Sequence, residues 1–452
     1  MSNKIAIIGA GSAVFSLNLI RDLCLTRNLE GSTISLMDIN QTRLDAVHLL
    51  CQRYAREMGM ELTVTKTTNR QEALQDADFV VNTALAGSHD KLRAGWAVAK
   101  ELGYRFGGSY AIMHDEAFWV NFYQMRLFES VIQDVLSICP NAWYLQLANP
   151  VMMGITYLTR RYPKAKIVGI CHGYGHVYEL AHLILGLDRE QVKDITFEVP
   201  GVNHFIWLTR MYYKGQDIFP LLDEWIATKS EEHFRTVRPS SGVGPKAVDL
   251  YKRFGAYPIG DTCTPGGGTW PWWYHVDAET EARWREDPNT WWENYFPHDL
   301  AQVEEIIRAS HDDSVKVSEV FPPEHSGETV VPMIESIACD IPRVQILNVP
   351  NSGNYVPGVP LDFQVEIGCL VSKRGVQGIA THGLPEALIA YILKDRVGPA
   401  ELELRAYLEG SRQLLHQLIL NDPWTRSEAQ AKELLNRLLA LPQLKELAEH
   451  YQ

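Results

Sequence analysis

The sequence lacks the features that mark membrane, nucleic-acid-binding and secreted proteins. No run of about 18 apolar residues could cross a bilayer, and the N-terminus has no charged and then apolar leader. Lys and Arg total 42 against 55 Asp and Glu, a net charge of −13, and no basic run could neutralise a phosphate backbone. We therefore expect a cytoplasmic protein with no nucleic-acid partner and no membrane partner.

Cysteine is scarce and unpatterned. The chain has seven in 452 residues, with no CxxC pair: Cys24, Cys51, Cys139, Cys171, Cys263, Cys339 and Cys369. An odd number scattered along a long chain predicts reduced thiols, most of them filling the core. Low-complexity segments are also missing, and the length predicts two domains or one large α/β unit with an appendage.

The chain opens with a pattern typical of dinucleotide binding. The apolar run KIAIIGA, residues 4–10, leads into Gly9 and Gly11 and then into a helix-like segment. Glycines there permit a tight turn and a close backbone approach, so that N–H groups at the helix start can hold a pyrophosphate. Val14 stands where the usual fingerprint has its last glycine, so a plain structural turn is the alternative.

A second strand, STISLMD, ends at Asp38, which lies 27 residues after Gly11. A carboxylate there can accept hydrogen bonds from an adenosine ribose, which favours NAD over NADP. Asp38 could also cap the helix that follows it. The candidate cofactor-binding residues are Gly9, Gly11, Ser12, Ala13, Val14, Phe15, Asp38 and Asn82.

Strand-like and helix-like segments alternate through the first half. Strands are expected at 61–67, 78–85, 142–152 and 164–170, with a long helix at 118–138. This alternation predicts an α/β fold with a Rossmann-like, doubly wound parallel sheet. The second half loses the alternation and predicts a mixed α+β domain with antiparallel strands. We place the boundary near residue 195, giving an NAD-binding domain at 1–194 and a substrate, metal and oligomerisation domain at 195–452.

Polar residues gather where the predicted strands end. Ligands of doubly wound sheets bind at the carboxyl ends of strands, where Asn82, Asn149 and Cys171 belong. Cys171 begins a Cys-His-Gly turn, and His204 follows Asn203 between two apolar segments. Thiolate and imidazole suit manganese, zinc or iron with open positions for substrate oxygens. The alternatives are a packing cysteine and a hydrogen-bonded core histidine; His172 and His176 could add ligands or support.

Several segments together resemble glycoside hydrolase family 4. They are GAGSAVFSLNLIRDLC at 9–24, LMDIN at 36–40, NP at 149–150, CHG at 171–173, GVNH at 201–204, GDT at 260–262, the stretch 348–371 and the closing NDPWTRSEAQAKELLNRLLALP. The resemblance runs nearly the full length. Cys-His-Gly is similar to the branch that acts on non-phosphorylated α-glycosides, whereas phosphosugar members usually carry Cys-Asn.

The resemblance implies a redox route to hydrolysis. Members oxidise the sugar C3 hydroxyl with bound NAD, which makes the C2 proton acidic. A divalent metal, Mn²⁺ by preference, would be bound by Cys171 and His204 and would polarise the carbonyl. The leaving group then departs by elimination, water adds, and the hydride returns to C3. The resemblance also implies that Asn149, His172 and Asn203 bind substrate.

Two carboxylates match family positions for proton transfer. Asp261 matches the proposed base, and Asp115 matches the acid that protonates the leaving oxygen. Asp261 could instead form a turn, and Asp115 could cap a helix. Tyr110 or Tyr274 is the alternative base, since some relatives use tyrosine.

The segment after Asp261, CTPGGGTWPWWYHVD, departs from the α-glucosidase pattern. Its glycines suggest a mobile lid, and its tryptophans suggest either a stacking wall for a sugar or a subunit interface: Trp270, Trp272 and Trp273. The group at the glycone C6 could be a hydroxyl or an anion. An anion would need an arginine fork, for which Arg105, Arg253 and Arg374 are candidates.

We therefore expect a glycosidase for a small-molecule, non-phosphorylated α-glycoside, α-glucosidase-like, using NAD and a divalent metal. An α-glucuronidase or a hydrolase of another anionic glycoside is the alternative within the family. Outside it, the alternatives are an NAD-dependent dehydrogenase of the 2-hydroxyacid type and a non-catalytic NAD sensor. We expect the active site in the crevice between the two predicted domains. Sites of this kind often include residues from across a dimer interface, so the resemblance implies a homodimer or homotetramer.

Overall fold

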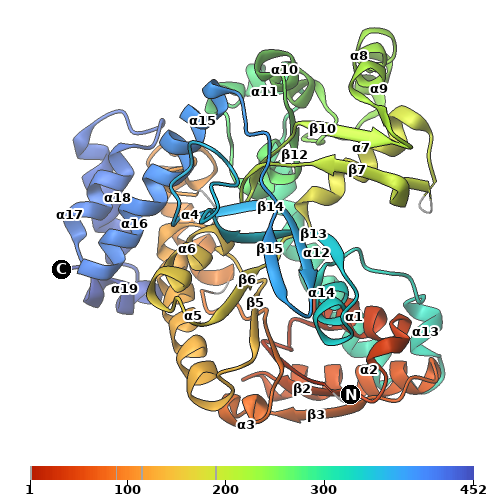
Figure 1. Ribbon diagram of the computed structural model, residues 1–452. Coiled ribbons are helices and arrows are strands. Elements are labelled where there is room, and N and C mark those ends of the chain that lie inside the picture. The colour runs from red at the N-terminus through yellow and green to blue at the C-terminus, as the bar shows by residue number, and fades with distance from the viewer. Residues whose placement is uncertain (1–2, 88, 114–115, 189–190) are drawn as a thin grey trace.

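The computed structural model describes residues 3–87, 89–113, 116–188 and 191–452. Its centre is a nine-stranded sheet in the order β15-β14-β13-β6-β5-β4-β1-β2-β3 (Figure 1). Six strands from the first half run parallel: β1 (Lys4–Ile8), β2 (Thr33–Met37), β3 (Thr63–Thr67), β4 (Phe79–Asn82), β5 (Trp143–Gln146) and β6 (Lys166–Gly169). Their order, 3-2-1-4-5-6, confirms the predicted doubly wound α/β fold.

The alternation of side chains along β1 divides the interior into two cores. Ile5 and Ile7 belong to the core shared with α1 (Ala13–Leu25) and α2 (Gln41–Glu57). Ala6 and Ile8 point to the opposite face and belong to the core shared with α5 (Phe118–Ile138) and the C-terminal helices. Both faces of the sheet are therefore buried, which is why its strands are continuous apolar runs.

Further helices connect the parallel strands, in the right-handed crossovers typical of this fold. They are α3 (Arg70–Leu74), α4 (His89–Glu101) and α6 (Val151–Arg161), whereas α7 (His176–Leu185) follows β6 and leads into the second half. The long helix expected at 118–138 is confirmed at those residues, and Leu127, Val131 and Val135 lie on its inner side because four-residue spacing keeps them on one face.

The second half completes the sheet. Strand β13 (Arg343–Pro350) bridges β6 in antiparallel sense, and β14 (Gln364–Ser372) and β15 (Gly375–Gly378) follow it. The bridge between β6 and β13 joins Gly169 to Asn348. The proposed division at residue 195 stays a prediction, but hydrogen bonds of the central sheet cross it.

The rest of the second half is the expected mixture of helices and antiparallel strands. One small sheet has the order β11 (Gln216–Asp217), β10 (Arg210–Tyr213) and β7 (Ile195–Glu198). The other has the order β12 (Tyr257–Ile259), β9 (Phe205–Leu208) and β8 (Gly201–Val202). Two turns of the candidate site adjoin this second small sheet. One lies between β8 and β9, and the other directly follows β12.

Helices fill the remaining length. Those between the small sheets and β13 are α8 (Phe219–Thr228), α9 (Ser230–Thr236), α10 (Pro245–Phe254), α11 (Ala278–Trp284), α12 (Pro288–His311), α13 (Val317–Val320) and α14 (Val330–Ala338). After β15 come α15 (Glu386–Ile392), α16 (Gly398–Glu409), α17 (Arg412–Leu420), α18 (Glu428–Leu439) and α19 (Lys445–His450). Figure 1 shows the last four gathered at one side of the molecule, and α18 and α19 contact α4 and α5.

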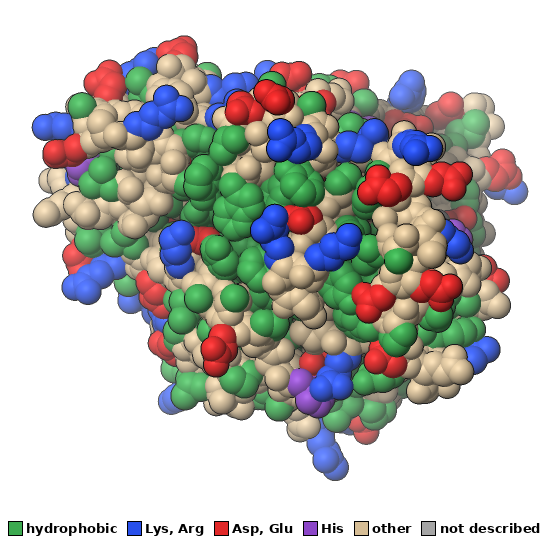
Figure 2. Space-filling view, turned by 90° about the horizontal axis from the view of Figure 1, so that it is seen from above, with side chains coloured by type: hydrophobic (Ala, Val, Ile, Leu, Met, Phe, Trp, Pro, Cys, Tyr) green, Lys and Arg blue, Asp and Glu red, His purple; other side chains and the backbone are tan. Residues whose placement is uncertain are grey.

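In the described part of the chain, no helix is long and apolar enough to cross a bilayer. Figure 2 shows acidic and basic side chains interspersed over one face, with hydrophobic side chains between them. The basic side chains on this face do not form a continuous patch, which agrees with the absence of a basic run in the sequence.

Candidate active site at the carboxyl edge of the sheet

The turn after β1 is built without room for side chains at its glycines. Gly9 has φ +89°, and a Cβ there would lie 2.5 Å from the Cα of Ala84. At Gly11 the backbone N–H donates to Oδ2 of Asp38 at 2.7 Å, and a Cβ would lie 2.7 Å from the same oxygen. The turn is therefore packed tightly enough for its backbone to approach a pyrophosphate, with the Asp38 carboxylate beside it.

Asp38 does not cap the next helix. Its Oδ1 accepts the N–H of Asn40 at 2.8 Å, and the Asn40 side chain then caps α2 by accepting the N–H of Arg43. The predicted capping role belongs to Asn40, because Asp38 lies two residues too early and faces the glycine turn. Recognition of a ribose by Asp38 stays a prediction.

The other predicted cofactor residues lie at the start of α1 and at the end of β4. Ser12 precedes α1, Ala13 is buried, and Val14 and Phe15 are partly buried in its first turn. The Asn82 side chain is fully buried; it donates to the Tyr144 hydroxyl at 2.8 Å and accepts the N–H of Ala84 at 3.2 Å. Asn82 thus braces the loop that faces Gly9.

A narrow cavity lies between α1, the ends of the parallel strands and a segment of the second half. Phe15, Thr83, Leu147 and Glu328 are among the residues that line it. Glu328 also lies 3.2 Å from Nδ1 of His172, and this hydrogen bond raises the pKa of His172 to about 9. Sequence reasoning missed Glu328, since its segment, Ser-Gly-Glu-Thr, has no pattern that distinguishes it from other loops.

Cys171 lies two residues after the end of β6 and is partly exposed. A Cβ added to Gly173 would lie 3.7 Å from the Cys171 Sγ and 3.8 Å from the Cα of Gly260. Gly260, with φ +58°, approaches the Gly173 carbonyl so closely that a Cβ would lie 2.7 Å from that oxygen. The Cys-His-Gly turn and the Gly-Asp-Thr turn therefore pack directly on each other.

His204 and Asp261 lie side by side at the end of the small sheet β8-β9-β12. Nε2 of His204 is 3.4 Å from Oδ2 of Asp261. The hydroxyl of Thr262 accepts the N–H of Ile206 and donates to its carbonyl, both at 2.8 Å, which fixes the Gly-Asp-Thr turn against the hairpin. His204 has φ +56° in the two-residue turn between β8 and β9.

The environment of Asp261 favours its ionised form. Burial alone would raise the pKa of Asp261, but nearby His204 and the hydrogen bond that Thr264 donates at 2.8 Å outweigh burial and lower it. His176 and His172 act in the same direction. Oδ1 is bound by Thr264 within the turn, and Oδ2 faces His204, so one oxygen has no part in the turn. The catalytic role of Asp261 stays a prediction.

The predicted metal ligands, Cys171 and His204, lie in turns from the two halves of the chain, and both turns contact the Gly-Asp-Thr turn. Among the described residues no group of three or more His, Cys, Asp or Glu side chains is arranged to hold a metal ion. A thiol and an imidazole at a partly open corner fit a divalent metal that completes its coordination with substrate oxygens. Cys171 and His204 as ligands stay a prediction.

The predicted substrate-binding residues differ in their surroundings. His172 is largely exposed beside Glu328. Asn203 is buried, and its side-chain amide donates to Glu366 at 2.9 Å, so it holds the turn that carries His204. The carbonyl of Asn149, before a cis Pro150, accepts from Gln124 at 2.7 Å. Their contacts with a sugar stay predictions.

The glycine-rich segment is packed against Asp261. A Cβ at Gly266 would lie 2.4 Å from the Asp261 Oδ1, and one at Gly267 would lie 2.4 Å from the Asp261 carbonyl. The buried guanidinium of Arg396 donates to the Gly267 carbonyl at 3.2 Å. The segment is therefore a wall around the carboxylate in this structure, which differs from the mobile lid that its glycines suggested.

The tryptophans divide between core and margin. Trp270 is fully buried, packs edge-on against Phe205 at 4.6 Å, and its indole N–H donates to Asp395 at 2.9 Å. It cannot be a sugar-stacking wall or an interface residue in this arrangement, because both faces lie in the core. Trp272 and Trp273 are partly exposed.

Neither alternative tyrosine is poised as a base. The hydroxyl of Tyr274 donates to Asp249, and burial raises the pKa of Tyr274 above its ordinary value. Burial also raises the pKa of Tyr110. Proton abstraction by either would require forming a buried phenolate, which is costly. Asp115, the predicted acid, lies outside the described residues.

The three arginines proposed for an anionic sugar lie elsewhere. Arg105 pairs with Glu281 at 2.8 Å, Arg253 pairs with Asp249 at 2.5 Å, and Arg374 is exposed at the turn between β14 and β15. Arg396 contacts the segment around Asp261 through the Gly267 carbonyl, and sequence reasoning missed it because its helical stretch carries no pattern that marks a site.

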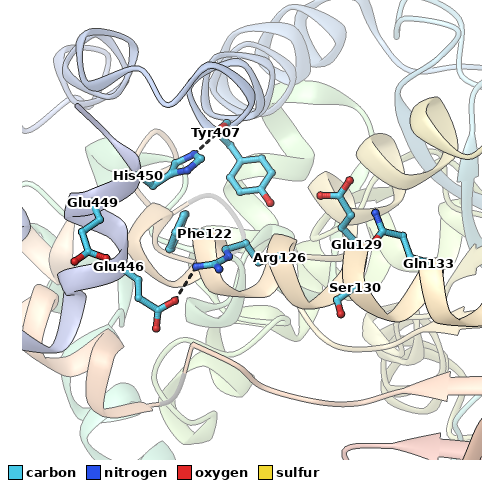
Figure 3. Close-up of a pocket in the computed structure, with 9 residues that line it drawn as sticks. All are labelled: Phe122, Arg126, Glu129, Ser130, Gln133, Tyr407, Glu446, Glu449 and His450. Atoms are coloured by element: carbon cyan, nitrogen blue, oxygen red, sulfur yellow. Dashed lines mark hydrogen bonds and ion pairs between the residues drawn. The ribbon is translucent and has the colours of Figure 1, made fainter. Parts of the chain in front are cut away.

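A larger surface cavity, of about 530 Å³, lies between α5, α16 and α19 (Figure 3). Its polar groups are already bonded: Arg126 pairs with Glu446 at 2.7 Å, His450 bonds the Tyr407 carbonyl at 2.7 Å, and Glu129 pairs with Arg161 at 2.7 Å. Every lining residue lies on these helices, so the cavity is separate from the turns that carry Cys171, His204 and Asp261.

Comparison with known proteins gives two family matches. Residues 4–186 match the profile described as Family 4 glycosyl hydrolase, and residues 199–425 match the profile of the Family 4 glycosyl hydrolase C-terminal domain. Together the two profiles cover most of the chain, including both turns of the candidate site.

Curated relatives match over nearly their full length. An α-galactosidase of Bacillus subtilis is 24% identical over 96% of this chain and 96% of its own. An α-galacturonidase of Thermoanaerobacter italicus is 25% identical over 96% of this chain and 95% of its own. Among solved structures, a 6-phospho-α-glucosidase from gut microorganisms, in complex with NAD and Mn²⁺, has a TM-score of 0.75 at 18% identity, covering 97% of this chain and 98% of its own.

Proposed function

The chain belongs to glycosyl hydrolase family 4, and from that membership and its site we propose that it cleaves a non-phosphorylated α-glycoside with NAD and a divalent metal. The observation that carries the proposal is the meeting of three turns. The turns of Cys171, His204 and Asp261 pack together at the edge of the sheet whose first turn carries Gly11 and Asp38. A dehydrogenase of the 2-hydroxyacid type gives no reason for this arrangement.

The residues present fit both groups that this chemistry needs. NAD fits the turn at Gly9 and Gly11, where no side chain could be accommodated, and the solved 6-phospho-α-glucosidase holds NAD and Mn²⁺ in the same fold. Cys171 and His204 would hold the metal. When bound, NAD supplies a hydride acceptor, and the metal supplies a Lewis acid for the sugar oxygens.

The protein side chains then have defined tasks. Asp261 Oδ2, ionised and next to His204, accepts the proton from C2 of the sugar. The Thr264 hydroxyl and the glycine-rich wall hold the carboxylate in place and limit the water around it. Asp115 donates a proton to the leaving oxygen. The net reaction is hydrolysis, because the hydride that leaves C3 returns to it.

The first candidate glycone is an uncharged hexose, as in an α-glucoside or α-galactoside. Cys-His-Gly in place of Cys-Asn supports a sugar without a phosphate, and the α-galactosidase relative supports a neutral one. This candidate predicts that activity depends little on ionic strength, since no charged group of the sugar is recognised.

The second candidate glycone is a uronic acid. A specific observation favours it. The guanidinium of Arg396 is buried and donates a hydrogen bond to the carbonyl of Gly267, and Gly267 belongs to the glycine-rich segment that packs on Asp261. The α-galacturonidase relative supports the same class. A buried guanidinium close to Asp261 would favour a sugar that carries a carboxylate at C6.

One assay tests the proposal and separates the two glycones. The reduced protein is incubated with NAD and Mn²⁺ and with nitrophenyl α-glucoside, α-galactoside, α-glucuronide or α-galacturonide, while nitrophenol and NADH are followed together. We expect nitrophenol release that requires both NAD and metal and that EDTA abolishes, without net NADH. Steady NADH accumulation without nitrophenol would overturn the proposal and identify a dehydrogenase.

A further inference from the structure

A buried chain of hydrogen bonds connects the strand end that carries Cys171 with the turn that carries His204. The backbone N–H of Asn203 donates to Oε1 of Gln364 at 3.0 Å, and Nε2 of Gln364 donates to Oδ1 of Asn348 at 2.6 Å. Asn348 Nδ2 then donates to the Gly169 carbonyl at 3.4 Å. Asn348 and Gln364 are both 0% exposed, so no water competes for these bonds. We call this chain the amide relay.

The direction of every bond in the amide relay is fixed by its ends. At one end stands a backbone N–H, which can only donate, and at the other a backbone carbonyl, which can only accept. Gln364 must therefore present its oxygen to Asn203 and its nitrogen to Asn348, and Asn348 must present its nitrogen to Gly169. Bonds aligned head to tail polarise one another, and a side chain with two acceptors at either position would break the sequence.

The relay crosses the junction between the two halves of the molecule. Asn348 is the β13 residue that bridges β6, at Gly169, and a Cβ on Gly169 would lie 2.7 Å from the Asn348 Cβ. Gly169 is two residues before Cys171, and Asn203 directly precedes His204. Through two side chains the relay thus ties together the backbone neighbours of the two proposed ligands.

A second contact holds the Asn203 end. The side-chain amide of Asn203 donates to Oε2 of Glu366 at 2.9 Å, and Glu366 lies opposite Asn348 in the β13 and β14 register. The turn is therefore held by two bonds, one from its backbone and one from its side chain. Buried amides add little net stability compared with apolar residues of the same shape. The amides of Asn348 and Gln364 each bond through both oxygen and nitrogen, which favours a positioning role for these two residues.

We propose that Asn348 and Gln364 are positioning residues: the amide relay sets the separation of Cys171 and His204 and thereby the affinity of this pair for a divalent metal. The inference rests on the proposed function, because it assumes that these two side chains bind the metal. Groups behind the ligands of metal sites commonly change metal affinity by about 10- to 100-fold when they are removed.

The test uses the full-length protein and a matched pair of variants. Gln364→Met removes both relay bonds while keeping the volume of the side chain. Gln345→Met is the control: Gln345 is also buried on β13, and its side-chain amide has no hydrogen-bond partner in the described part of the chain. Binding of Mn²⁺ is measured by calorimetry, and binding of Co²⁺ by the thiolate absorption band that Cys171 would produce.

We expect Gln364→Met to weaken Mn²⁺ binding by about tenfold or more and to change the Co²⁺ spectrum, while Gln345→Met leaves both unchanged. NAD affinity should remain as in the unaltered protein for both variants. The glycine turn follows β1, and β1 is separated from β13 by three strands of the sheet. If Gln364→Met does not fold, Asn348→Leu replaces it, because this variant removes the other side chain of the relay. We expect the same weakening of Mn²⁺ binding and the same change in the Co²⁺ spectrum.

The outcomes separate this inference from the function on which it rests. If the unaltered protein binds Mn²⁺, Cys171→Ala abolishes that binding, and Gln364→Met binds like Gln345→Met, then the positioning role is wrong and the proposed function stands. If the unaltered protein shows no Mn²⁺ binding that depends on Cys171, the proposed metal pair itself is wrong, and with it the inference.

Discussion

Asp261 is the side chain on which the proposed chemistry depends most directly. Asp261→Asn keeps the volume and the acceptor for Thr264 but removes the group that would take the C2 proton, so we expect kcat to fall by about 10²- to 10⁴-fold. The measurement is kcat with the nitrophenyl glycoside, together with incorporation of solvent deuterium at C2. Unchanged deuterium incorporation in this variant would assign the proton to another residue.

Gly11 is the residue whose substitution isolates the cofactor site. In Gly11→Ala the new Cβ would lie 2.7 Å from the Asp38 carboxylate, and we expect NAD binding to weaken by about 10- to 100-fold, the equivalent of the 1–3 kcal/mol that overpacking costs. Titration calorimetry measures it. Gly368→Ala is the control, because a Cβ at Gly368 finds only ordinary contacts at 3.6 Å and beyond.

At the scale of residues, the tight turn of Gly9 and Gly11 was predictable from the sequence, because the glycines form a local pattern directly after a strand. The sequence could not identify Glu328 or Arg396. Glu328 gains its significance from contact with His172, and Arg396 from contact with Gly267, and both contacts join segments far apart in the chain. Residue type alone does not distinguish them from surface charges.

Among the structural elements, the glycine-rich segment after Asp261 offers the sharpest test. Gly266→Ala would place a Cβ 2.4 Å from the Asp261 Oδ1, so we expect the carboxylate to shift and kcat to fall by about 10- to 100-fold with NAD affinity retained. Steady-state kinetics and NAD titration measure the two quantities. A variant with normal kcat would show that the segment moves away from Asp261 during turnover, as a lid would.

At the scale of elements, the parallel strands and the helix at 118–138 were predictable because each has an apolar pattern with a definite period. The role of the strands 343–350 and 364–372 was not. Their sequences predict strands, but only the folded chain shows that they extend the first half's sheet through one bridge at Gly169. Strand pairing between distant segments leaves no local signal.

At the scale of the whole molecule, Asp422 connects the C-terminal helices to the loop before the candidate acid. Its carboxylate accepts the N–H groups of Ser109 at 2.6 Å and Trp424 at 3.0 Å, and burial raises its pKa to about 6 from 3.8. A raised carboxyl pKa means that the folded state holds the proton more tightly than the unfolded state. The stability it confers is complete below about pH 4 and is lost as the pH rises through about 6.

Asp422→Asn should remove this dependence. Between about pH 4 and pH 7 we expect the free energy of unfolding of the unaltered protein to fall relative to the variant by about 2 kcal/mol, since one pKa unit corresponds to about 1.36 kcal/mol and the pKa lies at about 6 instead of 3.8. Urea unfolding at several pH values measures the difference. A difference that is constant with pH would mean that Asp422 stays ionised in the folded protein.

The oligomeric state belongs to the same scale and stays a prediction. The first half of α12 carries partly exposed aromatic side chains, with Trp291 stacked on Tyr295 at 5.3 Å and Tyr295 41% exposed. Such a patch favours self-association. We expect sedimentation at two or four times the monomer mass, and Trp291→Glu should shift the protein toward the monomer. A monomeric unaltered protein would contradict the prediction.

The sequence by itself determined the α/β class, the tight glycine turn after the first strand and the family, because each depends on residues close together in the chain or on motifs in a fixed order. Only the tertiary structure decided which groups meet. It placed His204 against Asp261, Glu328 against His172 and the amide relay behind Cys171. These contacts depend on how the two halves pack, and packing is set by the complementary shapes of distant segments rather than by any periodicity within them.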